Sequence, residues 1–198
     1  MALKFQYNKT TIQDLNKQLS IRQKALPILK NKETALRMEV KKRQASLTKA
    51  EAGKERIMEK VTQHAGFWDE FPEILFIDDL KASQELIVGV KILKIRDIEF
   101  KIADISWWKY PSWLPSGIEL LKEAATLFIT VDILKKQIMS LDKARKKTTQ
   151  KVNLYEKVQI PEMEQAILKI KRFLEDKENI SKAGQKIMKK RQSELMEK

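Results

Sequence analysis

The sequence predicts a mainly α-helical protein, in which the two ends of the chain form a long antiparallel two-helix coiled coil and the middle forms a small foot containing a β-hairpin. Three observations support this fold class. Apolar residues recur at alternating four- and three-residue intervals near both ends of the chain. Charged residues make up 34% of the 198 residues while Gly and Pro number only five each, which suits long solvated helices better than a loop-rich globule. All four Trp lie between the two periodic regions.

Residues 1–64 are expected to form the N-terminal coiled-coil helix. Stepping alternately four and three residues from Leu15 to Val61 meets fourteen positions, ten of them apolar, and the residues between are largely Lys, Gln, Glu and Thr. A sustained 3.5-residue repeat with polar flanks is typical of a coiled coil. Asn8 or Thr10 is a suitable N-cap and Gly66 a suitable stop. Pro27 cannot donate to the helical ladder, so a kink is expected there.

Residues 118–198 are expected to form the C-terminal coiled-coil helix. Its apolar stripe turns polar at Arg145 and Thr148, and Pro161 interrupts it before it resumes. Two amphipathic helices of this length cannot bury their stripes alone, so we expect them to pack against each other, antiparallel. The predicted seam residues of both helices are Leu15, Leu19, Leu26, Leu29, Leu36, Val40, Leu47, Ile57, Leu127, Val131, Leu134, Ile138, Val152, Ile167, Ile170 and Leu174.

Residues 65–117 are expected to form the foot at the bend between the helices. The stretch 85–105 is rich in β-branched residues and partly alternating, which predicts two strands with a turn near Arg96–Asp97. Trp107, Trp108 and Trp113 have two interpretations. They form the small core of the foot, or they form an exposed docking patch, since Trp is enriched at interface hot spots.

The sequence contains no recognisable catalytic, metal or cofactor site. There is no Cys, and the only His, His64, lies at the expected end of the first helix, where a role in complementing the helix dipole is favoured over one as general base or metal ligand. No apolar run approaches the roughly 20 residues that cross a bilayer, and the N-terminus lacks the apolar region of a signal peptide, so we expect a cytoplasmic protein.

The net charge of +13 is unevenly distributed, with +9 in residues 1–64, −3 in residues 65–117 and +7 in residues 118–198. Basic runs such as 41–43, 143–147 and 189–191 are either phosphate-binding or the solvated face of a coiled coil. The aromatic residues are concentrated in the acidic middle, so no stacking platform accompanies the basic runs.

Three motifs resemble the D subunit of the V-type and A-type rotary ATPases. Residues 151–178 are similar to the C-terminal helix of that family, residues 28–36 to its N-terminal helix, and residues 86–92 to its first hairpin strand. The motifs occur in the order of the family. The matching positions are Leu29, Lys30, Lys32, Leu36, Gly89, Val90, Lys91, Val152, Asn153, Glu156, Ile160, Pro161 and Glu164.

The resemblance implies a non-catalytic rotor in the central stalk that transmits torque between the catalytic hexamer and proton or sodium translocation in the membrane sector. Its implied partners are the catalytic and regulatory A and B subunits, the F subunit and the connecting subunit of the membrane rotor, which is of the C or d type. No nucleic acid is expected, and attachment to the membrane would be peripheral, through the complex. The resemblance implies no cofactor and does not distinguish pump from synthase.

The alternative from another functional class is a basic coiled-coil module that binds nucleic acid or an anionic membrane surface. Nucleic-acid affinity would fall linearly with the logarithm of salt concentration, which separates this alternative from a rotor. An enzyme is a third alternative, and no group of residues supports it.

Overall fold

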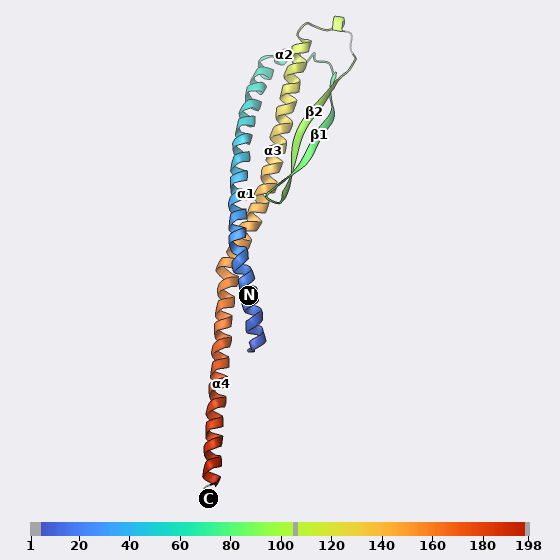
Figure 1. The fold of residues 1–198 in the computed structure, drawn as a ribbon. Helices are drawn as coiled ribbons and strands as arrows, with labels where there is room; N and C mark the ends of the chain where they lie inside the picture. Colours follow the sequence, from blue (N-terminus) through green and yellow to red (C-terminus); the bar gives the residue numbers. More distant parts are fainter. Residues whose placement is uncertain (1–4, 105–106, 197–198) are drawn as a thin grey trace. The chain divides into compact units, whose positions relative to one another are not determined.

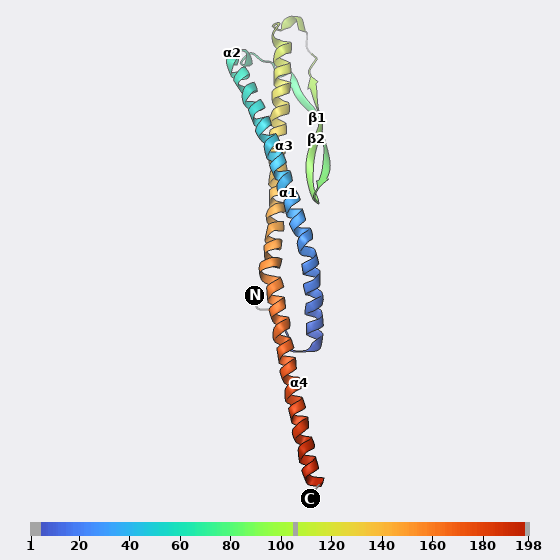
Figure 2. The same ribbon diagram turned by 60° about the vertical axis from the view of Figure 1, so that its left-hand side comes forward.

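The computed structural model describes residues 5–104 and 107–196, apart from the side chains of Phe67, Trp107 and residues 194–196. Two long helical arms accompany a two-stranded hairpin (Figures 1 and 2). The chain divides into two compact units, one formed by Met1–Asn31 with Thr148–Lys198 and the other by Lys32–Lys147. The predicted fold class is confirmed: the protein is mainly helical and carries one antiparallel hairpin.

The first arm is a single helix, α1, over Lys9–Gln63. Asn8 caps it, because its side-chain Oδ1 accepts a hydrogen bond from the Thr11 backbone N–H at 2.7 Å. The helix continues through Pro27, which lies inside it. At the other end, the Val61 carbonyl accepts hydrogen bonds from the His64 backbone N–H at 3.2 Å and from the Trp68 indole N–H at 2.8 Å, so it is satisfied without a further turn of helix. Trp68 belongs to the short helix α2, Ala65–Trp68.

The second arm consists of α3, Leu114–Leu154, a π-helical turn η2, Tyr155–Gln159, and α4, Ile160–Met196. Pro161 accounts for the π-helical turn, because its ring would clash with the carbonyl four residues earlier in a regular α-helix. The Ile160 N–H instead bonds to the Tyr155 carbonyl, five residues back. This wider turn absorbs one additional residue.

The additional residue explains a change of phase in the sequence. Up to Tyr155, the apolar stripe of this arm repeats every seven residues. The next residue of the stripe is the buried Met163, which follows Tyr155 by eight residues instead of seven. Beyond that point the period resumes, with Met163 and Ile170 both buried. The π-helical turn therefore keeps one continuous apolar face on a helix whose sequence pattern shifts by one residue.

The hairpin joins β1, Leu75–Ile87, to β2, Val90–Ile102. The predicted turn at Arg96–Asp97 is wrong: the chain turns at Val88–Gly89, where φ is +51° and +79°. Glycine adopts this left-handed conformation without a steric penalty, so it fixes the turn. The predicted position is instead a β-bulge, since Lys81 pairs with Asp97 and Ala82 with Ile95, leaving Arg96 as the extra residue.

A separate set of buried residues stabilises each unit. In the first unit Leu15 packs with Met163, Ala166, Ile167 and Ile170. In the second unit one cluster joins Leu36 of α1, Ile92 of β2 and Leu141 of α3. Another cluster in the second unit contains Ile74, Leu114 and Ile118, with Phe71, Tyr110 and Trp113 packed around them. Within each unit, α1 thus pairs with the returning arm and runs antiparallel to it.

Candidate interaction surfaces

Each of the predicted seam residues is buried or half-buried. Eight of them are buried, namely Leu15, Leu36, Leu47, Ile57, Val131, Val152, Ile167 and Ile170. The other eight are half-buried, namely Leu19, Leu26, Leu29, Val40, Leu127, Leu134, Ile138 and Leu174. The apolar seam leaves the polar flanks of the helices available for contacts with other molecules.

Two of the positions that resemble the D subunit form an ion pair between the arms of the first unit. Lys30 of α1 lies 2.6 Å from a carboxylate oxygen of Glu156 in the π-helical turn. Both side chains are almost half exposed, at 49% and 44%, so their attraction is weakened by solvent. The pair therefore contributes little to the free energy of folding.

Three further motif positions meet around the hairpin turn in the second unit. A Cβ atom at Gly89 would lie 3.3 Å from the Lys32 Nζ, which shows how closely that lysine approaches the turn. Val90 packs against the cluster that contains Leu36. The N-terminal helix motif and the hairpin motif are therefore neighbours in space, although more than fifty residues separate Lys32 from Gly89 in the sequence.

The remaining motif positions are spread along the arms, except for Lys91, which lies on β2. Val152 is buried, whereas Leu29, Ile160 and Pro161 are half-buried. Lys91, Asn153 and Glu164 are exposed. A Glu164 carboxylate oxygen accepts a hydrogen bond from the Gln23 side-chain amide at 3.4 Å. These positions do not converge on a single pocket.

The three candidate contact tryptophans differ in environment. Trp108 is 99% exposed, on the short helix η1, Trp107–Lys109. Trp113 is half-buried; its ring lies 6.2 Å from the Phe71 ring and close to Gly117, so it belongs to the foot's own core. The side chain of Trp107 lies outside the part of the chain that the structure describes. Of the three, Trp108 is therefore the one shown in an exposed position that suits a docking residue.

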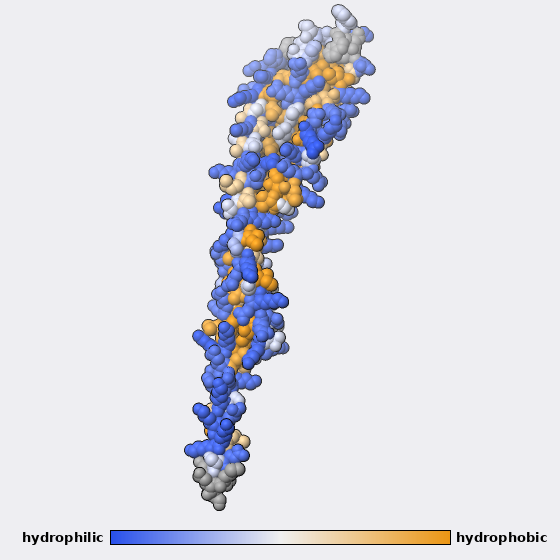
Figure 3. All heavy atoms as spheres, viewed as in Figure 1, coloured by the Kyte–Doolittle hydropathy of each residue, from blue (hydrophilic) through white to orange (hydrophobic). Residues whose placement is uncertain are grey.

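An apolar groove of about 470 Å³ lies beside β1, and the sequence did not indicate it. Phe71, Phe100 and Leu121 line it, together with Phe76 and Ile77, each of which is 52% exposed. Hydrophobic side chains also gather over the hairpin and the adjoining end of α3 on the face seen in Figure 3. Phe76 and Ile77 lie on β1, where charged residues at positions 78, 79 and 81 interrupt the alternation of the strand and hide its apolar face in the sequence.

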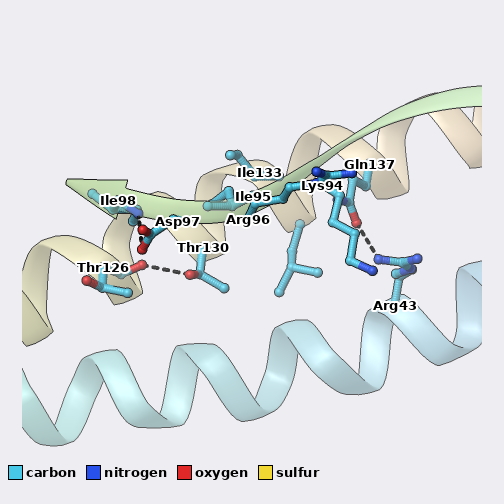
Figure 4. Close-up of a pocket in the computed structure, with 11 residues that line it drawn as sticks. Arg43, Lys94, Ile95, Arg96, Asp97, Ile98, Thr126, Thr130, Ile133 and Gln137 are labelled. Atoms are coloured by element: carbon cyan, nitrogen blue, oxygen red, sulfur yellow. Dashed lines mark hydrogen bonds between the residues drawn. The ribbon is translucent and has the colours of Figure 1, made fainter. Parts of the chain in front are cut away.

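A second cavity, of about 400 Å³, lies between the hairpin, α1 and α3 (Figure 4). Arg43, Lys94 and Arg96 line it together with Asp97 and the buried Gln137. Carboxylates lie near two of these cations, since Arg43 is 3.9 Å from a glutamate on α1 and Lys94 is 3.9 Å from one on β1. The positive charge around this cavity is therefore partly balanced from within the protein.

Ion pairs with neighbouring residues shift the pKa of an aspartate on α3 and of a lysine on β1. Hydrogen bonds from Arg145 and Lys146 hold the pKa of Asp142 below its ordinary value. A hydrogen bond and the charge of Glu99 raise the pKa of Lys81. These pairs join residues of one helix or of one hairpin, and they have the geometry of structural contacts and not of an acid–base site.

Within residues 5–104 and 107–196 there is no cluster of His, Cys, Asp or Glu that could hold a metal ion. The helices of the described part also include none long and apolar enough to span a membrane. His64 is exposed, and its Nδ1 lies 2.9 Å from the Lys60 carbonyl at the end of α1.

The C-terminal part of α4 extends past the beginning of α1 (Figures 1 and 2). Residues 175–193 are all exposed, and they include the apolar side chains of Ile180, Ile187 and Met188. The helix continues to Met196 although the apolar spacing of the sequence loosens after Leu174. This stretch of α4 is therefore a helix whose side chains are exposed on all sides.

Comparisons with known proteins match nearly the whole chain. The family of ATP synthase D subunits matches residues 11–190. The chain is 31% identical over 187 residues to the V-type ATP synthase D subunit of Borreliella burgdorferi, covering 91% of this chain and 93% of that protein. It is 28% identical to the protein of the same name from Chlamydia pneumoniae, covering 98% and 96%. The corresponding protein of Chlamydia muridarum is 25% identical, with coverage of 96% and 97%.

Proposed function

Because this chain belongs to the family of ATP synthase D subunits, we propose that it is the central rotor axle of a V-type or A-type rotary ATPase. In this role it is non-catalytic. It transmits torque between ATP hydrolysis or synthesis in the catalytic hexamer and ion translocation in the membrane sector.

The observation that carries the proposal is the pairing of two long antiparallel arms, from which α4 continues as an exposed helix. Paired helices resist twisting better than a single helix, because side chains of both arms interlock along the seam. Residues 175–193 carry six Lys and Arg against three Asp and Glu. Exposed basic pairs contribute only about 0–1 kcal/mol each, so such a surface contacts acidic loops of a surrounding ring without sticking to them.

The proposed partners are assigned to two different surfaces. The exposed helix of α4 would lie within the hexamer of A and B subunits. The foot, with exposed Trp108 and the apolar groove beside β1, would contact the F subunit and the C- or d-type connecting subunit. The chain would then be peripheral to the membrane and attached only through the complex.

A reversible cross-link tests rotation. The chain has no Cys, so Ile187→Cys introduces a single exposed thiol on α4. In the assembled ATPase, a cleavable thiol-to-amine cross-linker would join it to a neighbouring chain of the hexamer. We expect ATP hydrolysis to stop on cross-linking and to return when a reductant cleaves the linker.

Continued hydrolysis with most of the chain cross-linked would show that this protein is not the rotating part. A matched control uses Ser140→Cys on the exposed side of α3, treated with a monofunctional thiol reagent, which should leave hydrolysis unchanged. Binding of the isolated chain to single-stranded DNA, with an affinity that falls steeply with salt, would instead favour the basic-module alternative.

A further inference from the structure

Two arginines interrupt the apolar seam of α1 at equivalent heptad positions. Arg22 and Arg43 are 21 residues apart, which is three heptads. Each donates a hydrogen bond to a glutamine side chain of the returning arm: the Arg22 Nε to the Gln159 Oε1 at 2.7 Å, and an Arg43 terminal nitrogen to the Gln137 Oε1 at 2.8 Å. The first pair lies in the first unit and the second pair in the second unit. The same chemical pairing thus occurs twice along α1.

The spacing of the glutamines matches the spacing of the arginines once the π-helical turn is taken into account. Gln137 and Gln159 are 22 residues apart, one more than three heptads. The π-helical turn Tyr155–Gln159 lies at the end of this interval and absorbs one additional residue. The two glutamines therefore occupy equivalent positions of the returning arm, as the two arginines do on α1.

Both pairs are held by further contacts. The Arg22 guanidinium lies 6.0 Å from the centre of the Tyr155 ring, and its Nη1 donates to the Gln18 carbonyl at 3.3 Å. Gln137 is only 5% exposed, and its side-chain amide also donates to the Leu93 carbonyl of β2. Figure 4 shows Gln137 pointing from α3 toward Arg43. Gln137 therefore connects α1, α3 and the hairpin.

The apolar seam alone does not define one alignment of the arms. Leucine, isoleucine and valine recur at heptad spacing on both arms, so a pair displaced by one or two turns would again bury apolar side chains. The connection between α1 and α3 fixes only one end of the pair. A displaced pair would, however, separate each half-buried arginine from its glutamine and leave the donor that reaches across to the returning arm without this acceptor, which is costly.

We propose that Arg22 and Arg43 are register-determining residues, and that their pairs with Gln159 and Gln137 select one axial alignment of the two arms. Polar pairs of this kind specify alignment at some expense of stability. The proposal concerns the helix pair itself and does not depend on the rotor function, so either can fail without the other.

Cross-linking of two introduced thiols in the full-length chain reports the alignment. The side chains of Gln23 and Glu164 meet at 3.4 Å across the first unit, so Gln23→Cys with Glu164→Cys, joined by a short bifunctional thiol reagent, reports the native register. Gln23→Cys with Lys171→Cys reports a register displaced by one heptad, because seven residues of helix place the second thiol about 10 Å farther along the arm. The chain has no other Cys, so each cross-link identifies one alignment.

The decisive variant replaces one polar pair by an apolar pair, Arg22→Leu with Gln159→Leu. We expect the displaced cross-link to rise by about tenfold or more relative to the parent, while the midpoint of thermal unfolding stays equal or increases. A merely structural contact would lower the midpoint and leave the ratio of the two cross-links unchanged. Arg37→Leu with Gln165→Leu, at exposed positions, is the matched control and should leave the ratio unchanged.

The exchanged variant, Arg22→Gln with Gln159→Arg, keeps the pair and should retain the native cross-link. The same strategy applies to the second unit with Arg43→Leu and Gln137→Leu, where the thiol cross-link between Glu51→Cys and Lys135→Cys reports the native register, since the ends of those side chains are 3.0 Å apart. A native cross-link ratio in both leucine variants would overturn the proposal. So would an exchanged variant that slips as readily as the double-leucine variant, and this second outcome decides the question even where the leucine variants fold poorly.

Discussion

At the scale of single residues, individual contacts determine how this protein responds to pH. Hydrogen bonds from Arg145 and Lys146 lower the pKa of Asp142 in the folded protein. A carboxyl group whose pKa is lower in the folded than in the unfolded state stabilises the fold above its unfolded pKa of about 3.9, and that stabilisation is lost as the pH falls through the folded pKa.

Asp142→Asn should therefore make the free energy of unfolding less dependent on pH below about pH 5. Chemical denaturation at several pH values between about 3 and 7 measures this dependence. Lys147→Gln, a nearby exposed position, is the control and should retain the slope of the parent. An unchanged slope in Asp142→Asn would show that this carboxylate does not contribute to acid sensitivity.

Gly89 is the residue that the hairpin turn requires. Its φ is +79°, and a Cβ atom there would also approach the Lys32 Nζ at 3.3 Å. Gly89→Ala should reduce the free energy of unfolding by about 1–2 kcal/mol, the usual cost of a left-handed conformation in an L-residue. At Gly184, inside α4, an added Cβ would meet no side chain within 4 Å, so Gly184→Ala should instead stabilise its helix by up to about 1 kcal/mol. Equal effects of the two substitutions on thermal stability would contradict this explanation.

At the scale of secondary-structure elements, the π-helical turn compensates for one extra residue in the returning arm. Removing Val158, which lies in that turn and is 38% exposed, brings the apolar stripe back to a seven-residue period. Combined with Pro161→Ala, which removes the ring clash, this deletion should give a continuous α-helix that folds with a thermal midpoint close to that of the parent.

The matched control deletes one residue from a regular part of the same arm. Removal of Lys147 from α3 rotates all following residues by about 100° relative to the seam, so apolar side chains leave the interface. Circular dichroism on heating should show a clearly lower midpoint for this variant than for the Val158 deletion. Similar midpoints for the two deletions would mean that the π-helical turn does not adjust the phase.

At the scale of the whole molecule, the proposed function depends on two arms that stay together under load. Leu36 is completely buried between Ile92 and Leu141. Leu36→Asp places a charge in this cluster, which costs several kcal/mol and separates the arms locally. In the assembled ATPase, we expect this substitution to reduce ion pumping per ATP hydrolysed before it abolishes nucleotide binding by the ring.

The ratio of ion transport to ATP hydrolysis in membrane vesicles measures this coupling. Met38→Asp, at a position that is 65% exposed on the same helix, is the control and should retain the parent ratio. Full coupling in Leu36→Asp would show that the cluster around Leu36 is not needed to transmit torque.

The sequence by itself determined the long helices, their antiparallel pairing and the apolar stripe along them, because heptad periodicity depends on local spacing and persists over many turns. It also located motif positions such as Lys30 and Glu156, but not their contact. It misplaced the hairpin turn, because charged residues at positions 78, 79 and 81 hide the alternation of β1 and the bulge at Arg96 resembles a turn.

Tertiary structure alone decided the pairs that join distant parts of the chain. Arg22 with Gln159, and Arg43 with Gln137, are more than ninety residues apart in sequence, and no local spacing connects them. It also decided that one tryptophan, at position 113, belongs to the foot's core while another, at position 108, is exposed, since identical residue types differ only in what folds over them. Periodicity is a property of one helix, whereas alignment and exposure depend on the partner that packs against it.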